Sequence, residues 1–265
     1  MKKYLVVGNP ISHSLSPKVH NYWFNENMID ASYQKKEASY DQLKNIIEML
    51  RNKRLDGANI TVPFKERIIP FLDKLSDEAK EANSVNTIYL SENIVVGHNT
   101  DISGFYNSIK SRNLEFKNKK ALILGSGGVT PSIIIGLRKL GISEVTISNR
   151  TIEKAIMLKK RFSHIKVLEW GGTTDANIII NSTSLGLKKT DEIKLDKSYF
   201  RTDNIFYDVI YNPEETNFLK NAKEHGCITQ NGLMMFLLQA AESFKVWHKI
   251  EPIVNNNLIN FLKND

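Results

Sequence analysis

The stretch ANITVPFKE, residues 58–66, places a lysine two positions after a proline. Residues 55–62 end in β-branched side chains typical of a strand, and residues 64–75 carry apolar side chains at helical spacing. Pro63 therefore predicts a strand-to-helix switch with Lys65 in the first helical turn. The positive end of a helix favours a neutral amine over an ammonium, so Lys65 is a candidate proton donor and acceptor. The alternative is a solvated surface lysine, one of 36 Lys and Arg residues.

A carboxylate and an amide occur where they could assist this lysine. Asp101 stands in VVGHNTDISGF and Asn86 in NSVNTIYL, both at the margins of expected strands. An aspartate beside such a turn is usually an Asx-turn or helix-cap residue. Together with Lys65, however, its carboxylate could orient the lysine and a substrate hydroxyl. Lys65 and Asp101 are therefore the candidate acid–base pair.

Two serines precede the first expected helix. In NPISHSLSPKVHN, Ser14 and Ser16 lie between a strand and a helix that is expected to begin near Pro17. Both hydroxyls could donate to a carboxylate near the positive end of that helix, although Ser16 is also a typical N-cap residue. His13 and His20 lie nearby, and isolated histidines are more often structural than catalytic.

A glycine cluster follows a later apolar strand. LILGSGGVTPS places Gly125, Gly127 and Gly128 at a strand-to-helix turn, where backbone amides and the helix N-terminus can bind a pyrophosphate. Thr130 occupies the place of the third glycine of the dinucleotide fingerprint. The alternative is a glycine-rich turn that binds no cofactor.

The stretch ISNRTIEKA, about twenty residues further on, indicates which dinucleotide would bind. An NAD-binding unit usually has an acidic residue at the end of its second strand, but here Asn149 and Arg150 stand there. A guanidinium can pair bidentately with the 2′-phosphate of NADP, and Thr151 and Lys154 can add a hydrogen bond and a charge. We therefore predict NADP rather than NAD.

The order of the expected elements predicts how these residues are positioned. Strand-like and helix-like segments alternate over the first hundred residues, which is typical of a mostly parallel sheet covered by helices, and VNTIYL with NIVVGHNT is expected to form a hairpin at its edge. A second α/β series begins near Lys119. The tail, residues 232–262, has apolar residues at helical spacing, and we expect it to pack on the first unit.

Composition limits the functional classes. The chain has 265 residues, 41% of them hydrophobic, and a net charge of +7 that suits anionic ligands. The basic residues are dispersed, which argues against a nucleic-acid partner. The single cysteine, Cys227, excludes an internal disulfide and a cysteine-based zinc cluster, and no metal site is expected. The N-terminal apolar run is too short for a signal peptide, and no stretch approaches the roughly 18 apolar residues of a membrane span, so we expect a cytoplasmic protein without a membrane partner.

A series of motifs follows one another along the chain: GNPISHSLSPKVHN, NITVPFK, VNT, GHNTDISGF, GSGG, NRT, DVIYNPEET and NGLMMFLLQAA. In order and approximate spacing they resemble the shikimate dehydrogenase family over nearly the whole chain. The resemblance implies an α/β substrate-binding domain of residues 1–101, completed by C-terminal helices in residues 233–265, and a Rossmann-like NADP-binding domain of residues 102–232. It also implies NADPH-dependent, reversible reduction of 3-dehydroshikimate to shikimate in the pathway to chorismate and aromatic amino acids.

The resemblance further implies a role for individual positions. Lys65 and Asp101 match the catalytic pair of the family. The substrate-contacting positions are Ser14, Ser16, Asn59, Thr61, Lys65, Asn86, Asp101, Tyr211 and Gln239. The cofactor-binding positions are Asp77, Gly125, Ser126, Gly127, Gly128, Val129, Asn149, Arg150, Thr151, Lys154, Val209 and Gly232.

Two stretches depart from the family pattern. GSGGVTPSI stands where the family commonly has GAGGAxRA, which removes a basic side chain and places Pro131 and Ser132 in the first helical turn. In NTDISG, Ile102 replaces a frequent glycine. Both departures bear on cofactor affinity and leave the catalytic groups in place.

Two other functions stay open at this point. A quinate/shikimate dehydrogenase would accept an additional hydroxyl and often use NAD; the serine pair and Arg150 argue against it. A non-catalytic regulator would bind a pathway intermediate, but it would be free to lose Lys65 and Asp101, which are both present. The sequence also leaves the oligomeric state open, with a homodimer as one expectation.

Overall fold

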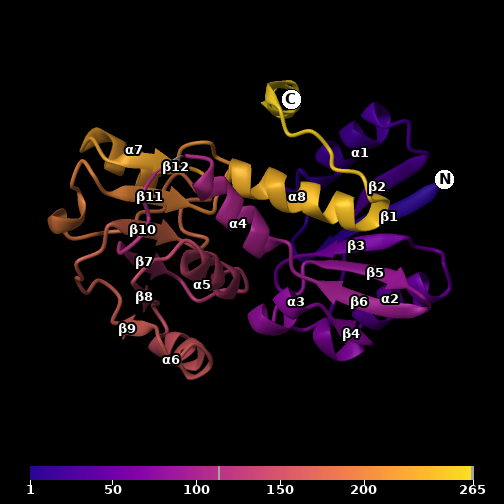
Figure 1. Cartoon of the computed structure of the whole chain (residues 1–265), viewed down its shortest axis with the longest axis horizontal. Helices are drawn as coiled ribbons and strands as arrows, with labels where there is room; N and C mark the ends of the chain where they lie inside the picture. Colours follow the sequence, from indigo (N-terminus) through magenta and orange to yellow (C-terminus); the bar gives the residue numbers. More distant parts are fainter. Residues whose placement is uncertain (113, 264–265) are drawn as a thin grey trace. The chain divides into compact units, whose positions relative to one another are not determined.

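The computed structural model of the chain describes residues 1–112 and 114–263 and divides into two compact units. One unit comprises Met1–Gly104 and Leu237–Asp265, and the other comprises Phe105–Phe236. Helices α4 (Asp101–Lys110) and α8 (Leu233–His248) each begin in one unit and end in the other (Figure 1). Within the described residues, no helix combines the length and the apolar character that a membrane span requires.

The first unit contains a six-stranded sheet in the order β2-β1-β3-β5-β6-β4. Its strands are β1 (Lys2–Gly8), β2 (Ala31–Glu37), β3 (Gly57–Ile60), β4 (Lys74–Leu75), β5 (Thr87–Ser91) and β6 (Ile94–His98). Strand β5 is antiparallel to β3 and β6, and the other neighbouring pairs are parallel. The predicted hairpin is thus present as β5–β6, but the short strand β4, and not the hairpin, forms this edge of the sheet.

Alternation along these strands sends different side chains to the two faces of the sheet. The helices of the unit, besides α8, are α1 (Ser16–Glu26), α2 (Leu43–Arg51), α3 (Asp77–Ala82) and α9 (Asn256–Lys263). On one face Val7, Ala58 and Ile88 pack in a hydrophobic cluster with residues of α2. On the other face Tyr4 packs against aromatic rings of α1 and α8, and the neighbouring strand β3 presents the polar Asn59. A polar side chain is therefore buried under α8.

The helix predicted over residues 64–75 is wrong. The chain there forms turns, the short 3-10 helix η1 (Ile69–Phe71) and strand β4. Pro70 has no amide hydrogen and its ring clashes with the preceding turn, so an α-helix cannot pass through it. Phe64 and Ile68 are buried four residues apart, which explains why their spacing looked helical. Lys65 therefore lies in a turn, and the helix-dipole argument does not apply to it.

The second unit contains a parallel sheet in the order β12-β11-β10-β7-β8-β9. Its strands are β7 (Lys120–Leu124), β8 (Glu144–Ser148), β9 (Lys166–Leu168), β10 (Ile178–Asn181), β11 (Ile205–Asp208) and β12 (Ile228–Gln230). Its other elements are α5 (Thr130–Lys139), α6 (Ile152–Arg161), η2 (Lys197–Tyr199) and α7 (Asn217–Glu224). Counted from β7, the strand order is that of the Rossmann fold, which confirms the predicted architecture.

The C-terminal tail packs on the first unit, as predicted. The last part of α8, in yellow, passes beside β3 (Figure 1), where Trp247 covers Gly57. A Cβ atom at Gly57 would lie 2.6 Å from the indole nitrogen of Trp247, so the helix can approach the strand this closely only because the residue is glycine. The same indole donates to the carbonyl of Ile88 at 3.3 Å.

Candidate active site

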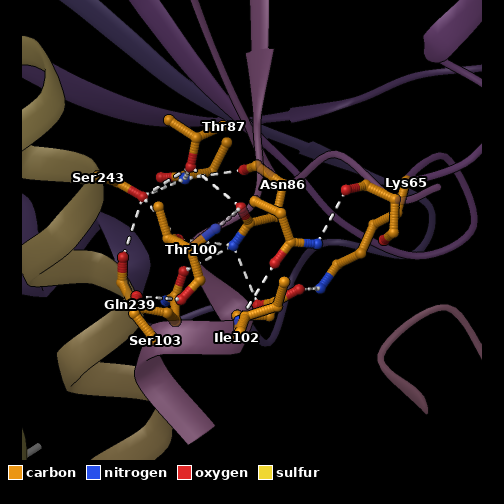
Figure 2. A network of polar contacts seen from close by, with 12 residues as sticks. Lys65, Asn86, Thr87, Thr100, Ile102, Ser103, Gln239 and Ser243 are labelled. Atoms are coloured by element: carbon orange, nitrogen blue, oxygen red, sulfur yellow. Dashed lines mark hydrogen bonds and ion pairs between the residues drawn. The ribbon is translucent and has the colours of Figure 1, made fainter. Parts of the chain in front are cut away.

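The first unit brings Lys65 and Asp101 into contact. Lys65 Nζ lies 2.5 Å from Asp101 Oδ2, although the residues are 36 positions apart (Figure 2). Their side chains are 12% and 6% exposed, so solvent screens this ion pair far less than a surface pair. An ammonium and a carboxylate held in this way can exchange a proton with a ligand while the carboxylate fixes the position of the amine.

Sheet topology explains why these residues meet. Strands β3 and β6 are both antiparallel to β5, so they run in the same direction and end at the same edge of the sheet. Lys65 follows β3, Asp101 follows β6, and Asn86 directly precedes β5 at that edge. The carbonyl of Lys65 accepts the Val85 amide at 2.8 Å, which ties the turn after β3 to the start of β5.

Asn86 determines the orientation of the Asp101 carboxylate. Asn86 Nδ2 donates to Asp101 Oδ1 at 3.0 Å and to Thr100 Oγ1 at 2.8 Å, and Asn86 Oδ1 accepts the Thr100 amide at 2.8 Å. Both carboxylate oxygens of Asp101 thus have a donor, since Oδ2 accepts from Lys65. The carboxylate plane is therefore fixed before any ligand binds.

Asn59 holds the backbone of Asn86 in place through a hydrogen bond. Asn59 Nδ2 donates to the backbone carbonyl of Asn86 at 2.9 Å, and Asn59 Oδ1 accepts the hydroxyl of Tyr33 at 2.6 Å. Burial raises the pKa of the Tyr33 hydroxyl well above its ordinary value, so this group stays protonated and donates. Asn59 is only 7% exposed, so most of its side chain lies within the network.

Ser14 and Ser16 lie together at the start of α1. Ser14 Oγ lies 3.2 Å from Ser16 Oγ and accepts the Ser16 amide at 3.3 Å. The N-cap position is occupied by Leu15, so the expectation that Ser16 could serve as the N-cap is wrong, and Ser14 binds the amide instead. The Ser16 side chain is also a hydrogen-bond partner of the Tyr33 hydroxyl. Tyr33 thereby connects the serine pair to Asn59.

Two further predicted substrate positions belong to the same unit. Thr61 follows β3, and its methyl group would lie 2.6 Å from a Cβ atom at Gly8, so a side chain at Gly8 would displace it. Gln239 lies on α8 and accepts from Asn86 Nδ2 at 3.3 Å. Tyr211 instead belongs to the second unit, where its ring stacks on Phe236 with the centroids 4.5 Å apart.

In the second unit, the glycine loop lies at the carboxyl end of β7. Gly125 has a φ of +108°, and a Cβ atom there would lie 2.8 Å from Ser182 Oγ, so a larger residue would be strained and would clash. A Cβ atom at Gly127 would meet nothing closer than 3.9 Å, which leaves this side of the loop open to a ligand. Helix α5 begins at Thr130, and its N-cap residue Val129 has no side-chain acceptor for the first amides.

Ser126 lies within this loop and is the predicted position with the clearest unmet hydrogen-bonding capacity. Its Oγ atom is buried and has no hydrogen-bond partner among the residues that the structure describes. A buried hydroxyl without a partner is costly, and a phosphate oxygen would supply the missing acceptor. The loop therefore fits the pyrophosphate of a dinucleotide.

The predicted 2′-phosphate residues lie at the end of the neighbouring strand. The Gly125 amide donates to the carbonyl of Ser148 at 2.8 Å, which places the end of β8 beside the glycine loop. Asn149 and Arg150 follow, and the Asn149 side chain donates to the carbonyl of Thr151 at 2.7 Å. Arg150, Thr151 and Lys154 are exposed at the start of α6, and no acidic residue occupies the end of β8. This charge pattern suits a phosphate.

The remaining cofactor candidates, Val209, Gly232 and Asp77, do not all belong to one unit. Val209 and Gly232 are in contact, since a Cβ atom at Gly232 would lie 2.1 Å from the carbonyl oxygen of Val209. Asp77 belongs to the first unit, where it is the first residue of α3 and its side chain is 98% exposed. Ile102, the departure from the family glycine, is 1% exposed and donates its amide to the Asn99 side chain at 3.2 Å.

Several polar residues of the site could not be singled out from the sequence. Tyr33, Thr87, Thr100 and Ser243 are all buried, and each contacts Asn59 or Asn86. Thr87 opens the apolar strand TIYLS, which was the one available signal, whereas Tyr33 stands between the polar residues Ser32 and Gln34 and carried none. Thr100 and Ser243 carried no such signal, because contacts with distant segments give them their role.

Comparison with known proteins places this geometry in a family. Residues 6–88 match the family model described as the shikimate dehydrogenase substrate binding domain, and residues 108–194 match the model described as shikimate / quinate 5-dehydrogenase. A relative from Pelagibacter ubique, named shikimate dehydrogenase (NADP(+)), is 54% identical over 261 residues and covers 98% of each chain.

Solved structures agree with the sequence comparisons. The crystal structure of shikimate dehydrogenase from Aquifex aeolicus has a TM-score of 0.89 and 37% identity, and the match covers 100% of this chain and 98% of that one. Shikimate 5-dehydrogenase from Thermus thermophilus, solved in complex with NADP(H) and shikimate, has a TM-score of 0.88 and 30% identity over 99% and 98% of the two chains. The motifs, the fold and these relatives agree, and the chain belongs to the shikimate dehydrogenase family.

Proposed function

We propose that the chain catalyses the NADPH-dependent, reversible reduction of 3-dehydroshikimate to shikimate, a step toward chorismate and the aromatic amino acids. The observation that carries the proposal is the buried contact between Lys65 and Asp101, whose atoms lie 2.5 Å apart. Family membership supports the reaction, because relatives that match nearly the whole chain are named shikimate dehydrogenase (NADP(+)).

Proton transfer is the task of Lys65. Bound NADPH supplies the hydride that reduces the ketone carbon. The Lys65 ammonium donates a proton to the substrate oxygen as negative charge develops there, and in the reverse direction the amine accepts it. Asp101, oriented by Asn86, keeps the ammonium in position and accepts a hydrogen bond from the substrate hydroxyl.

The substrate carboxylate is assigned to the serine pair. Ser14 and Ser16 are 3.2 Å apart through their hydroxyl oxygens and precede or begin α1, whose positive end attracts an anion. Both hydroxyls can turn from each other toward a carboxylate without moving the backbone. We assign the ring hydroxyls to the other predicted positions, which are Asn59, Thr61, Asn86, Tyr211 and Gln239.

The second unit is assigned to NADP. The residues of the glycine loop, from Gly125 to Val129, would hold the pyrophosphate, with Ser126 as a donor. Arg150 would pair with the 2′-phosphate, assisted by Asn149, Thr151 and Lys154. We assign Val209 and Gly232 to the nicotinamide end and Asp77 to a weaker cofactor contact.

The proposal also covers the roles of the two units, the location of the protein in the cell and its oligomeric state. We assign substrate binding to the first unit and NADP binding to the second, following the domains implied by the sequence. We also propose a cytoplasmic enzyme and a homodimer. Light scattering after size-exclusion chromatography tests the dimer, because a mass near 30.2 kDa would contradict it.

The test is the change in nicotinamide absorbance with shikimate or quinate as substrate and NADP⁺ or NAD⁺ as cofactor. Turnover restricted to shikimate with NADP⁺ is the expected result. Turnover with quinate or NAD⁺ would indicate a quinate/shikimate dehydrogenase of broader cofactor use. Absence of turnover in all four pairs, together with measurable shikimate binding, would contradict the proposal and support a regulator that only binds the intermediate.

A further inference from the structure

We propose that Ser243, on helix α8, is a positioning residue for the Lys65–Asp101 pair. The inference rests on the proposed function and extends it to a helix that enters the first unit from the C-terminal part of the chain. The Ser243 hydroxyl contacts Asn59, Thr87, Thr100 and Gln239, so it acts on Lys65 and Asp101 through other side chains.

Ser243 lies at the centre of a buried polar cluster. Its side chain is 0% exposed, and its Oγ atom lies 2.8 Å from Thr87 Oγ1, 3.0 Å from Asn59 Nδ2 and 3.2 Å from Thr100 Oγ1 (Figure 2). It also donates to the carbonyl of Gln239 one turn earlier, at 3.0 Å. These contacts come from β3, β5 and the segment before α4, so one hydroxyl joins two strands and a connecting segment to the helix.

The number of available hydroxyl hydrogens determines which groups of the cluster donate and which accept. Ser243 has one hydroxyl hydrogen, which it donates to the Gln239 carbonyl, and its two lone pairs can accept from the Asn59 amide and one further hydroxyl. The Thr87 hydroxyl donates to Asn86 Oδ1 at 3.2 Å. Thr100 Oγ1 accepts from Asn86 Nδ2, which leaves the Thr100 hydroxyl hydrogen for Ser243. The hydrogen bonds therefore run from Asn86 through Thr100 and Ser243 to the helix backbone.

This direction connects Ser243 to catalysis. The amide group of Asn86 that donates to Thr100 also donates to Asp101 Oδ1. Without the Ser243 acceptor, Thr100 must turn its hydrogen elsewhere, and the Thr100 oxygen then no longer faces Asn86 in the same orientation. The Asn86 amide is then held less firmly on its Thr100 side, so the plane of the Asp101 carboxylate, which accepts from the same amide group, is less firmly fixed.

The position of Ser243 is itself fixed by packing. Trp247 lies one helical turn further along α8 and is seated against Gly57 with its indole hydrogen on the carbonyl of Ile88. This contact determines the rotation of α8 about its axis and therefore keeps the Ser243 hydroxyl facing Asn59 and Thr87.

The test compares Ser243→Ala with a matched control, Ser108→Ala. Ser108 is also a buried helical serine; its hydroxyl donates to the carbonyl of Phe105 at 2.8 Å and lies 3.0 Å from the hydroxyl of Tyr207 in the second unit. Both substitutions remove a buried hydroxyl and should lower thermal stability to a similar extent. Only Ser243→Ala should lower kcat for shikimate oxidation, by about tenfold, with KM for shikimate within about twofold of wild type.

A second measurement does not depend on activity. Hydrogen exchange of the Asn59 and Asn86 side-chain amides, followed by NMR, should be slow in the wild-type chain and in Ser108→Ala, and faster in Ser243→Ala. If Ser243→Ala does not fold, Ser243→Cys nearly preserves the volume but weakens the hydrogen bonds, and it should show the same two changes.

The outcomes separate the inference from the function on which it rests. A wild-type chain without turnover on shikimate contradicts the proposed function, and amide exchange then still decides the role of Ser243. An active wild type with kcat unchanged in Ser243→Ala, or unchanged exchange of Asn86 in that variant, would overturn the inference and leave Ser243 as a packing residue.

Discussion

Asn86 donates to one oxygen of Asp101 at 3.0 Å while Lys65 binds the other at 2.5 Å. The carboxylate is thus bound from both sides by residues of different turns, and Asn86 is attached in its turn to the residue before Asp101 through two hydrogen bonds. The pair that we propose as catalytic therefore needs no rearrangement of its own side chains when substrate arrives. Its preorganisation is the feature on which the following predictions depend.

Replacing the Asp101 carboxylate by an amide of the same size tests the role of its negative charge. Asp101→Asn keeps the side-chain size but removes the negative charge that holds the Lys65 ammonium. We expect kcat for shikimate oxidation at saturating NADP⁺ to fall by about a hundredfold or more. Asp41→Asn, at an exposed position, is the control and should retain wild-type kcat. A fully active Asp101→Asn enzyme would show that the carboxylate is not part of the reaction.

Cofactor choice should depend on Arg150. Arg150→Ala removes the guanidinium that we assign to the 2′-phosphate, which NAD⁺ lacks. We expect KM for NADP⁺ to rise by about tenfold to a hundredfold and KM for NAD⁺ to stay within about twofold. Lys197→Ala removes an exposed charge elsewhere in the second unit and should change neither constant. An equal rise for both cofactors would exclude recognition of the 2′-phosphate by this side chain.

Ser126 allows a test of the pyrophosphate site. Its hydroxyl oxygen is buried without a hydrogen-bond partner in the described part of the chain. Ser126→Ala should therefore leave the thermal stability of the cofactor-free chain unchanged or slightly higher. It should also weaken NADPH binding, measured by fluorescence titration, by about tenfold, because a hydrogen bond to a charged phosphate is lost. Unchanged affinity would show that this hydroxyl does not contact the cofactor.

Buried His20 should make stability depend on pH. The side chain is 0% exposed, its ring stacks on Tyr33 at 4.3 Å, and burial, together with the charge of His248, lowers its pKa from 6.5 to about 3. Below pH 6.5 the unfolded chain binds a proton at His20 that the folded chain refuses. The stabilisation is therefore fully present above pH 6.5 and decreases as the pH falls, by about 2 kcal/mol between pH 7 and pH 5.

Urea unfolding at pH 7 and pH 5 tests this prediction by comparing wild type with His20→Phe. The comparison is needed because burial raises the pKa of Asp208 to about 6, so its carboxyl group stabilises the fold at low pH and loses that effect as the pH rises. His20→Phe keeps an aromatic ring but cannot bind the proton. Between pH 7 and pH 5, its free energy of unfolding should therefore fall by about 2 kcal/mol less than that of the wild-type chain. His164→Gln, at an exposed position, should behave as wild type. Identical pH dependence in all three chains would contradict the prediction.

The second unit could be predicted closely because its signals are local. The apolar strand β7, the glycine turn at Gly125 and the basic residue at Arg150 each depend on neighbouring residues, and right-handed parallel connections then leave few possible topologies. The tail was also predictable, since its helical apolar face needs a surface to cover. Thr130 in place of the third glycine does not prevent the turn, since its buried hydroxyl lies 3.1 Å from that of Ser182.

The backbone structure of the segment that follows Lys65 in the first unit could not be predicted from the sequence. The spacing of Phe64 and Ile68 suggested a helix, but Pro70 and the attachment of Asp73 to the amide of Val95, at 2.8 Å, draw the segment into a short edge strand instead. Helix α3, whose N-cap Ser76 accepts the Ala79 amide at 3.2 Å, was not predicted either. Tertiary contacts overrode the local pattern in both segments.

The same distinction holds for the site. The motifs were sufficient to propose Lys65, Asp101 and Asn86, because all three stand next to strands, and the structure brings their side chains into contact. Ser243 and Tyr33 could not be selected in this way, since a serine within a helix or a tyrosine within a strand gains a role only from the distant residues that it contacts. Such residues become visible when the hydrogen bonds of the folded chain are counted.

The role of Lys65 in proton transfer is tested by comparing turnover with shikimate binding in Lys65→Ala. Shikimate oxidation with NADP⁺ should fall by about a thousandfold or more, while the Kd for shikimate, measured by calorimetry, should rise only a few-fold. Lys44→Ala, on the exposed side of α2, should match wild type in both measurements. A Lys65→Ala enzyme that turns over near the wild-type rate would contradict the assignment of proton transfer to this residue.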